Sequence, residues 1–297
     1  MGEGHACQVW YQIQAQVHPR PSHAQLASRL IQEFKAGKPP TTDIYIGSEA
    51  HFLNLHRAGA LESVNWNALS PTIPGGAIAP DNIGIAFASR MPGVVYNTKL
   101  VPKNKVPRVL NDLLDPQWKR KIASTPYAAA FDRAAMILSD EAVTRFLKEL
   151  VRENLAGLIR CAEDERIISG EFTMMALTCG AGQTDILNAK GAPIAHVILQ
   201  DIPLINYWYL GVPKNSPHPS LAKLFTVFMV TEEAQKILWE TEAYDLHLIK
   251  GTNTYRLVEE LRRKGVEPRV FGVQEVVGRD KMFDTLREKY QKILLGK

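Results

Sequence analysis

The chain has 297 residues, 45% of them apolar and 22% charged, which is the composition of an ordinary globular protein. This length is enough for one large core or two of medium size, and we expect two lobes. The formal charge of +4 is spread along the chain without a cluster of Lys and Arg interleaved with aromatic residues, which argues against a nucleic-acid partner.

The first 21 residues contain no basic stretch followed by an apolar core, so they do not form a secretory signal peptide. No run of about 18 apolar residues occurs, which excludes a membrane-spanning helix. The three cysteines, Cys7, Cys161 and Cys179, show neither a disulfide framework nor metal-ligand spacing. Cys161 and Cys179 either pair with each other or are small buried apolar residues.

Ser22 is a candidate N-cap for a helix over residues 23–35, whose apolar side chains recur every three or four positions. A short buried strand over residues 43–46 follows. Because ligands of open α/β sheets bind at the carboxyl ends of strands, Ser48 and Glu49, just after this strand, are candidate ligand contacts. Ser48 either offers its hydroxyl and N–H to a ligand or only caps the next helix.

The run IGIAFASR over residues 83–90 predicts a strand that leads towards a hinge. Arg90 ends this strand, and its planar guanidinium suits a carboxylate or phosphate. The alternative is an arginine that is solvated or paired for structural reasons.

Residues 93–123 form an ordered series of signals. Val94 to Tyr96 predict a strand, two prolines interrupt the link, and residues 109–114 predict one or two helical turns that end before Asp-Pro. A further strand begins at residue 121. Tyr96 lies where the chain leaves the hinge and is a candidate ligand contact.

Residues 124–133 read STPYAAAFDR, which predicts a helix capped by Ser124 or Thr125 with Pro126 in its first turn. The free N–H groups of Tyr127 and Ala128 would then form an anion site at a strand end. Tyr127, Ala128 and Arg133 are therefore candidate ligand contacts, although a tyrosine here is about as often simple packing.

An amphipathic surface helix is predicted over residues 139–155, followed by alternating strands and helices. A strand over residues 171–178 ends at Cys179, which is a further candidate contact. The loop from Cys179 to Gly182 has neither GxGxxG nor P-loop spacing, which argues against a nucleotide site.

Residues 191–198 predict a strand in which His196 is a core or edge residue rather than a ligand contact. Residues 201–213 predict a return crossing. Tyr207 and Tyr209 share one face of that strand, so they either flank a ligand in a cleft or pack within a sheet.

Three motifs resemble the periplasmic solute-binding proteins of ABC transporters, in particular the ferric-iron, polyamine and thiamine branch. They are DIYIGS at residues 43–48, YNTKLV with DLLDPQWKRKIA at residues 96–123, and VPKNSPHPSLAKLF at residues 212–225. The resemblance covers most of the chain. It implies an α/β, type II periplasmic-binding-protein-like fold with two lobes, mixed sheets with helices on both faces, and a hinge of two crossing strands.

The resemblance also implies a domain layout. Lobe 1 is expected to comprise residues 1–95 and 210–265, lobe 2 residues 96–209, and C-terminal helices residues 266–297. The family pattern becomes recognisable only near Ser22, so we expect the first βαβ unit to be missing or replaced by the stretch before it.

The implied function is capture of a small solute between lobes that close by hinge motion, as the periplasmic component of an ABC-type importer. The expected partners are the solute and the transporter permease; the expected state is a monomer without cofactor, metal or catalytic residue. The resemblance implies two adjacent tyrosines in the ferric-ion binders of this family, at the position where this chain has Leu177, Thr178 and Cys179. An anionic or polar organic solute is therefore favoured over free ferric ion.

The alternative is an enzyme or ligand sensor built on the same scaffold, because a fold does not fix a function. The sequence contains no GxSxG, HExxH or CxxC motif and no recognisable pair of catalytic carboxylates.

Overall fold

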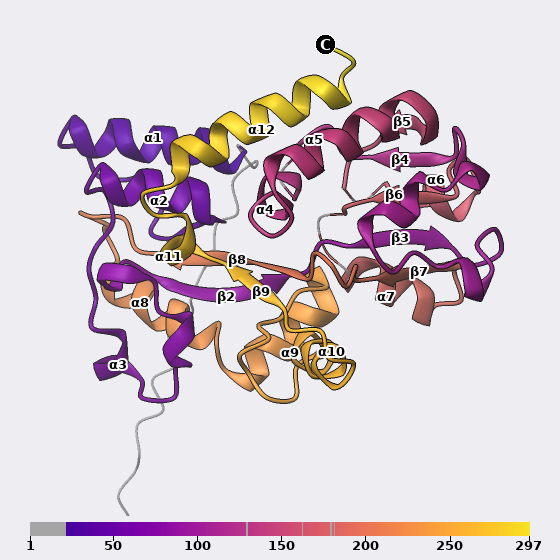
Figure 1. The fold of residues 1–297 in the computed structure, drawn as a ribbon. Helices are drawn as coiled ribbons and strands as arrows, with labels where there is room; N and C mark the ends of the chain where they lie inside the picture. Colours follow the sequence, from indigo (N-terminus) through magenta and orange to yellow (C-terminus); the bar gives the residue numbers. More distant parts are fainter. Residues whose placement is uncertain (1–21, 129, 162, 179, 181) are drawn as a thin grey trace, which may run out of the picture.

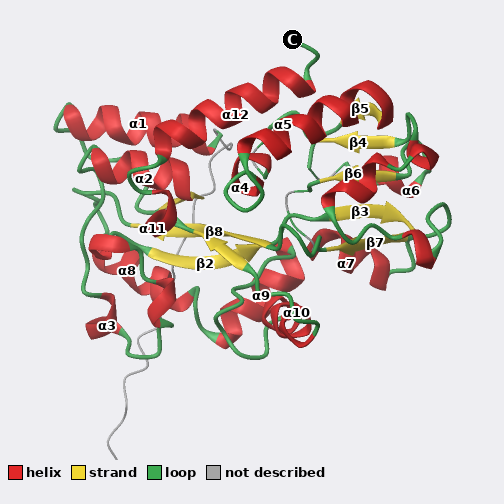
Figure 2. Ribbon diagram, in the orientation of Figure 1, coloured by secondary structure: helices red, strands yellow, loops and turns green. Residues whose placement is uncertain are grey.

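Two β-sheets, each with helices packed on it, define two lobes in the computed structural model, which describes residues 22–128, 130–161, 163–178, 180 and 182–297 (Figure 1). The sheet of lobe 1 has four strands and that of lobe 2 has five. Strands and helices alternate around both sheets (Figure 2), as expected for a mixed α/β fold. The predicted fold class is confirmed.

The longer helices are α1 (His23–Lys35), α2 (Glu49–Arg57), α5 (Asp140–Glu149), α7 (Gly182–Ala189), α8 (Pro219–Phe228), α9 (Glu232–Glu242), α10 (Asn253–Arg263) and α12 (Asp280–Leu294). Four helices have only four residues: α3 (Trp66–Leu69), α4 (Phe131–Ala134), α6 (Glu165–Ile168) and α11 (Val273–Val276). None of the described helices is both long enough and apolar enough to cross a membrane.

In the lobe 1 sheet, β8 (Leu204–Gly211) is the central strand. It runs antiparallel to its neighbours β1 (Tyr45–Ser48) and β2 (Ile85–Arg90), and parallel to β9 (Arg269–Phe271). The lobe 2 sheet has the order β5 (Leu155–Leu158), β4 (Ile122–Ser124), β6 (Met174–Ala176), β3 (Val94–Asn97), β7 (Ile194–Val197).

The chain crosses between the lobes twice, from β2 to β3 and from β7 back to β8. Every residue of β8 pairs with β1, β2 or β9 of lobe 1, so the return crossing lies between residues 197 and 204, earlier than the predicted lobe boundary at residue 209. Because β9 pairs with β8, the segment after residue 265 also adds a strand to lobe 1. The predicted loss of a first βαβ unit falls on residues outside the described part of the chain.

The helix at residues 23–35 forms as predicted. Ser22 accepts a hydrogen bond from the N–H of Gln25, and the Gln25 side chain accepts one from the N–H of Ser22, which completes a capping box. One apolar core then runs through both lobes, with Trp66 and Phe52 fully buried in lobe 1 and Phe131 and Leu147 buried in lobe 2.

The helix predicted to begin at Ser124 is wrong. Residues 125–128 are not helical, Ala128 has φ of 55°, and α4 begins only at Phe131. A left-handed residue interrupts the α-helical hydrogen-bond series, so the alanines do not extend the helix back to Pro126. The row of free N–H groups predicted at a helix start is therefore not formed there.

Candidate functional site

The ends of several strands meet where the two lobes face each other. β1 and β2 are both antiparallel to β8, so they are parallel to one another and their carboxyl ends, at Ser48 and Arg90, lie at the same edge of lobe 1. The loop after β6 of lobe 2 approaches this edge, because a Cβ atom added at Gly180 would lie 3.8 Å from Cβ of Arg90. Residues from both lobes therefore line one crevice.

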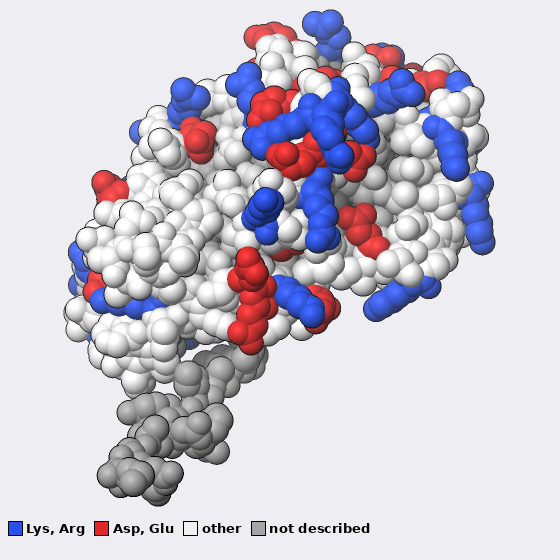
Figure 3. Space-filling model, turned by 90° about the horizontal axis from the view of Figure 1, so that it is seen from below, with Lys and Arg blue, Asp and Glu red and all other residues white. Residues whose placement is uncertain are grey.

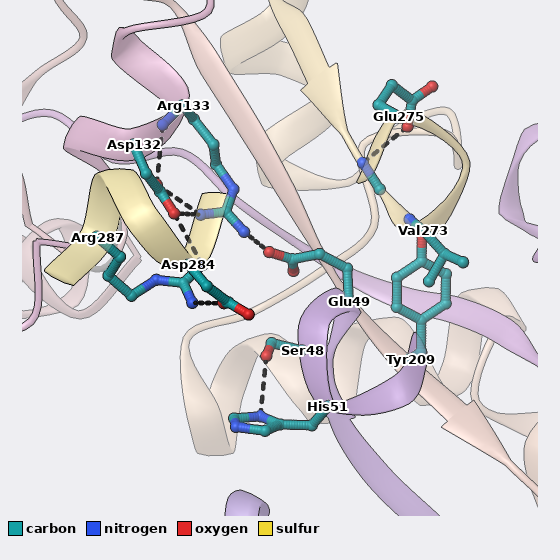
Figure 4. Close-up of polar contacts among 11 residues, drawn as sticks. Ser48, Glu49, His51, Asp132, Arg133, Tyr209, Val273, Glu275, Asp284 and Arg287 are labelled. Atoms are coloured by element: carbon teal, nitrogen blue, oxygen red, sulfur yellow. Dashed lines mark hydrogen bonds and ion pairs between the residues drawn. The ribbon is translucent and has the colours of Figure 1, made fainter. Parts of the chain in front are cut away.

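A cluster of paired charges joins the two lobes, and we call it the interlobe brace: Glu49, Asp132, Arg133 and Arg287 (Figure 4). Glu49, the first residue of α2 in lobe 1, forms an ion pair with Arg133 of α4 in lobe 2. Nη1 of Arg133 also donates to Asp132 at 2.8 Å, and Nη2 of Arg287 donates to the second Asp132 oxygen at 2.8 Å.

The three carboxylate and guanidinium groups nearest the centre of the brace are almost fully buried. The exposed fractions are 2% for Glu49, 0% for Asp132 and 3% for Arg133. Burial raises the pKa of Asp132 to about 7, although the adjacent Arg287 opposes this shift, and burial lowers the pKa of Arg133 to about 9. Buried charges of this kind are tolerated only because they compensate each other.

Helix α12 supplies Arg287 to the brace and forms further ion pairs with both lobes. It lies across both lobes (Figure 1), with Asp280 paired to Arg57 of lobe 1 and Lys289 paired to Asp140 of lobe 2 at 2.7 Å. The Tyr290 hydroxyl donates to the same Asp140 at 2.8 Å. The brace and α12 thus connect the lobes through polar contacts that already have partners.

Arg90 has a different environment. Its guanidinium carbon lies 5.4 Å from the ring centroid of Trp208 and 5.9 Å from that of Tyr244. Its Nε is buried, and within the described residues Arg90 makes neither a hydrogen bond nor an ion pair. Burial lowers the pKa of Arg90, yet arginine stays protonated at neutral pH, so an uncompensated cation stands at the crevice.

The crevice opens into a cavity of about 480 Å³ between the lobes. We call it the Arg90 pocket; Arg90, Gly180, Asp185, His196, Gln200 and Tyr244 are among the residues that line it. His196 was predicted to be a satisfied core or edge residue, but its buried Nε2 has no partner among the described residues. Burial lowers the pKa of His196 to about 3, so the ring is neutral and able to accept or donate one hydrogen bond.

A larger cavity of about 780 Å³ lies on lobe 2 alone, between the turn at Leu110–Leu114 and α5. Lobe 1 contributes none of the described residues that line it. Closure of the lobes would leave this cavity unchanged. We therefore do not assign the solute site to it, although it is larger than the Arg90 pocket.

Tyr207 and Tyr209 pack inside lobe 1. Tyr209 stacks on Phe52 at 5.1 Å and accepts a hydrogen bond from the N–H of Val273, and Tyr207 stacks on His247 at 5.6 Å. Both are about 5% exposed or less, and burial raises the pKa of both phenols. These contacts support the sheet-packing alternative for the pair.

The remaining predicted contacts are dispersed. Ser48 does not cap α2 with its side chain; its hydroxyl lies 3.2 Å from Nδ1 of His51. Tyr96 is half-buried in β3 and Tyr127 is exposed, whereas Ala128 is fully buried. Cys179 lies outside the described residues. Cys161 is disulfide-bonded, and both other cysteines fall outside the described part of the chain.

Sequence reasoning thus named Arg90, Glu49 and Arg133 as candidate ligand contacts. It did not name the residues that surround them in the structure. Tyr244, which follows α9, and Asp185 of α7 line the pocket, whereas Trp208 of β8 contacts Arg90 without being one of the lining residues. One sequence pattern could have indicated Trp208. Side chains alternate between the two faces of a strand, so Trp208 lies on the face of β8 opposite Tyr207 and Tyr209.

The model of the family of bacterial extracellular solute-binding proteins matches residues 11–246. The chain is 23% identical over 231 residues to the major ferric iron-binding protein of Neisseria meningitidis serogroup A, a match that covers 74% of this chain and 69% of that protein.

Solved structures agree on the fold. A substrate-binding protein of an ABC transporter from Agrobacterium tumefaciens has a TM-score of 0.74 and 17% identity, covering 91% of this chain and 83% of that one. Iron-bound HitA from Pseudomonas aeruginosa has a TM-score of 0.74 and 20% identity, covering 91% and 88% of the two chains. The matched family and these neighbours are transporter solute-binding proteins and not enzymes.

Proposed function

The chain belongs to the family of bacterial extracellular solute-binding proteins, and from that premise we propose that it captures a small organic solute with an anionic group in the Arg90 pocket. The lobes close on the solute by hinge motion at the two crossings, and the closed form delivers it to the permease of an ABC importer. The proposed location is the periplasm, where proteins of this family act, and the proposed state is a monomer.

The observation that carries the proposal is the uncompensated guanidinium of Arg90. The Nε of Arg90 is buried without a partner, which costs free energy, and an anion bound by the guanidinium offsets that cost. The planar fork of arginine forms two parallel hydrogen bonds with a carboxylate or a phosphate. The flanking rings of Trp208 and Tyr244 restrict the guanidinium and leave its remaining donors for the pocket.

Contributions from both lobes support hinge closure. Arg90 belongs to β2 of lobe 1, whereas Gly180 and Asp185 belong to lobe 2. A solute that contacts both sides binds the closed form more tightly than the open form and so shifts the equilibrium towards closure.

The relatives that bind ferric iron suggest another cargo, but the residues of this chain favour the organic anion. Glu49, the carboxylate at the strand end, is already paired with Arg133. Leu177 and Thr178 stand where two adjacent tyrosines would supply oxygen ligands. The buried phenols of Tyr207 and Tyr209 have raised pKa values, which disfavours the phenolate that a hard cation would require.

Isothermal titration tests the proposal with a panel of carboxylates, phosphates and sulfonates, and with ferric ion supplied as its citrate complex. We expect saturable binding of at least one organic anion, which is recovered unchanged afterwards. Arg90→Met should weaken that binding about 10- to 100-fold, because a hydrogen-bonded charge pair is lost.

Arg166→Met serves as the matched control. Arg166 is an exposed arginine of lobe 2 that pairs with Glu171, so its loss should leave binding unchanged. Consumption of the ligand, or equal binding by the wild type and Arg90→Met, would overturn the proposal.

A further inference from the structure

A second charged group without a partner faces the Arg90 pocket. Asp185, in the first turn of α7, lines the same cavity as Arg90. Within the described part of the chain Asp185 makes no ion pair or hydrogen bond through its side chain, and none joins it to Arg90. One pocket therefore presents a free cation from lobe 1 and a free carboxylate from lobe 2.

The other charged groups of the pocket do not neutralise these two. Glu260 of α10 is paired with Lys264, and Arg256 of the same helix is an exposed second cation of lobe 1 whose side chain, like that of Arg90, has no ion pair among the described residues. The neutral His196 adds polarity without charge. Asp185 lies at the rim of the pocket and is exposed. Partial desolvation by burial raises its pKa to about 6, so its carboxyl group is ionised at neutral pH.

The charged side chains on the face that Figure 3 shows do not favour a ligand of either sign. Figure 3 shows the side of the molecule on which α9 and α10 lie, and acidic and basic side chains are interspersed there rather than gathered by sign. Selectivity must therefore come from the groups inside the pocket.

We propose that the Arg90 pocket takes a zwitterionic solute, a small molecule with both a carboxylate and an ammonium group. Its carboxylate binds Arg90 of lobe 1, and its ammonium group binds Asp185 of lobe 2. This inference rests on the proposed function and narrows its solute class to amino acids in the broad chemical sense.

The chemistry of the two groups matches that assignment. Arginine supplies only donors, and they fit the two oxygens of a carboxylate. An ionised aspartate supplies only acceptors, which fit the three N–H donors of an ammonium group. A carboxylic acid without an amine would leave Asp185 unpaired beside the ligand, and an amine without a carboxylate would leave Arg90 unpaired.

Placing the two charges on different lobes also couples recognition to closure. A ligand with both groups bridges α7 and β2, whereas a ligand with one group contacts only one lobe. The zwitterion therefore favours the closed form more than either half of it does.

The test is calorimetric titration with matched pairs of probes. Each pair is an amino acid and the carboxylic acid that lacks its amine, such as glycine with acetate, β-alanine with propionate and 4-aminobutyrate with butyrate, extended to the longer ω-amino acids and the common α-amino acids. The wild type should bind at least one amino acid about 10- to 100-fold more tightly than its amine-free partner.

Asp185→Asn should remove that preference and leave the affinity for the amine-free acid unchanged. Arg90→Met should weaken both members of the pair. Glu260→Gln is the matched control, because it neutralises a carboxylate of the same pocket that already has a partner; the preference should persist in it.

Failure of the inference is distinct from failure of the proposed function. Equal affinity for amino acids and amine-free acids, with no effect of Asp185→Asn, overturns the zwitterion while an effect of Arg90→Met still supports an anionic solute. Absence of binding by every amino acid of the panel also overturns the zwitterion. Binding that Arg90→Met does not weaken overturns both.

Discussion

The interlobe brace and the Arg90 pocket are two places where an arginine lies between the same two lobes, but they differ in pairing. Arg133 in the brace has Glu49 and Asp132 as partners, and Arg287 shares Asp132 with it. Arg90 has two aromatic rings but, among the described residues, no acceptor.

The difference in pairing distinguishes an arginine that stabilises the fold from one that is available to a ligand. A buried charge is retained at low cost when its partners compensate it, so the brace explains how α2, α4 and α12 stay together. An uncompensated charge costs stability, and such groups are retained where a ligand supplies the missing partner. The pattern of pairing therefore supports the proposed placement of the solute site at Arg90 rather than at the brace.

The largest expected difference in unfolding free energy is between two variants in which Arg133 or Arg90 is replaced by methionine. Arg133→Met leaves Glu49 buried without a partner, and we expect it to cost about 3–5 kcal/mol of unfolding free energy. Arg90→Met removes a charge that has no acceptor, so its cost should stay within about 1 kcal/mol, the loss of two cation–π contacts being offset by relief from desolvation.

Urea unfolding monitored by tryptophan fluorescence measures both variants. The two substitutions are matched in chemistry, and they differ only in what surrounds the guanidinium. Equal destabilisation by Arg133→Met and Arg90→Met would show that pairing does not distinguish the two regions.

The smallest effect is expected at the outer end of α12, where the charges are half-exposed. Hydrogen bonds from Lys289, Tyr290 and Thr144 lower the pKa of Asp140 below its usual value near 3.8. A carboxyl with a lowered pKa stabilises the folded state above that value, and this contribution is lost as pH falls through the folded-state pKa.

Asp140→Asn should therefore reduce the melting temperature slightly at pH 7, by the equivalent of at most about 1 kcal/mol, because exposed pairs are screened by solvent. The difference from the wild type should shrink in thermal melts as the pH falls below the usual aspartate pKa near 3.8, and vanish once the wild-type carboxyl is protonated. A difference that grows as the pH falls would contradict this account of α12.

Local signals in the sequence predicted individual helices and strands, whereas the two-lobed fold was predicted from the resemblance of three motifs to a known family. Apolar spacing and the Ser22–Gln25 capping box define α1, and β-branched runs define β2 and β3. The helix start at Ser124 was mispredicted, since the left-handed conformation of Ala128 depends on packing that no local pattern reports.

The site was predicted only in part for a similar reason. Residue chemistry and strand ends indicated Glu49, Arg90 and Arg133 as candidates. Whether each is paired depends on residues distant in sequence: Arg133 meets Glu49 from 84 positions away, and Trp208 lies 118 positions from Arg90. Pairing is a tertiary property, so the sequence could not separate the brace from the pocket.

Native mass spectrometry of protein purified without added ligand tests the central claim most directly. The account predicts that a fraction of the wild type carries one small-molecule adduct, which fragmentation identifies as containing a carboxylate and an amine. Arg90→Met should lose this adduct, and the Arg166→Met control should keep it. An adduct retained in full by Arg90→Met would contradict the claim that the unpaired arginine marks the solute site.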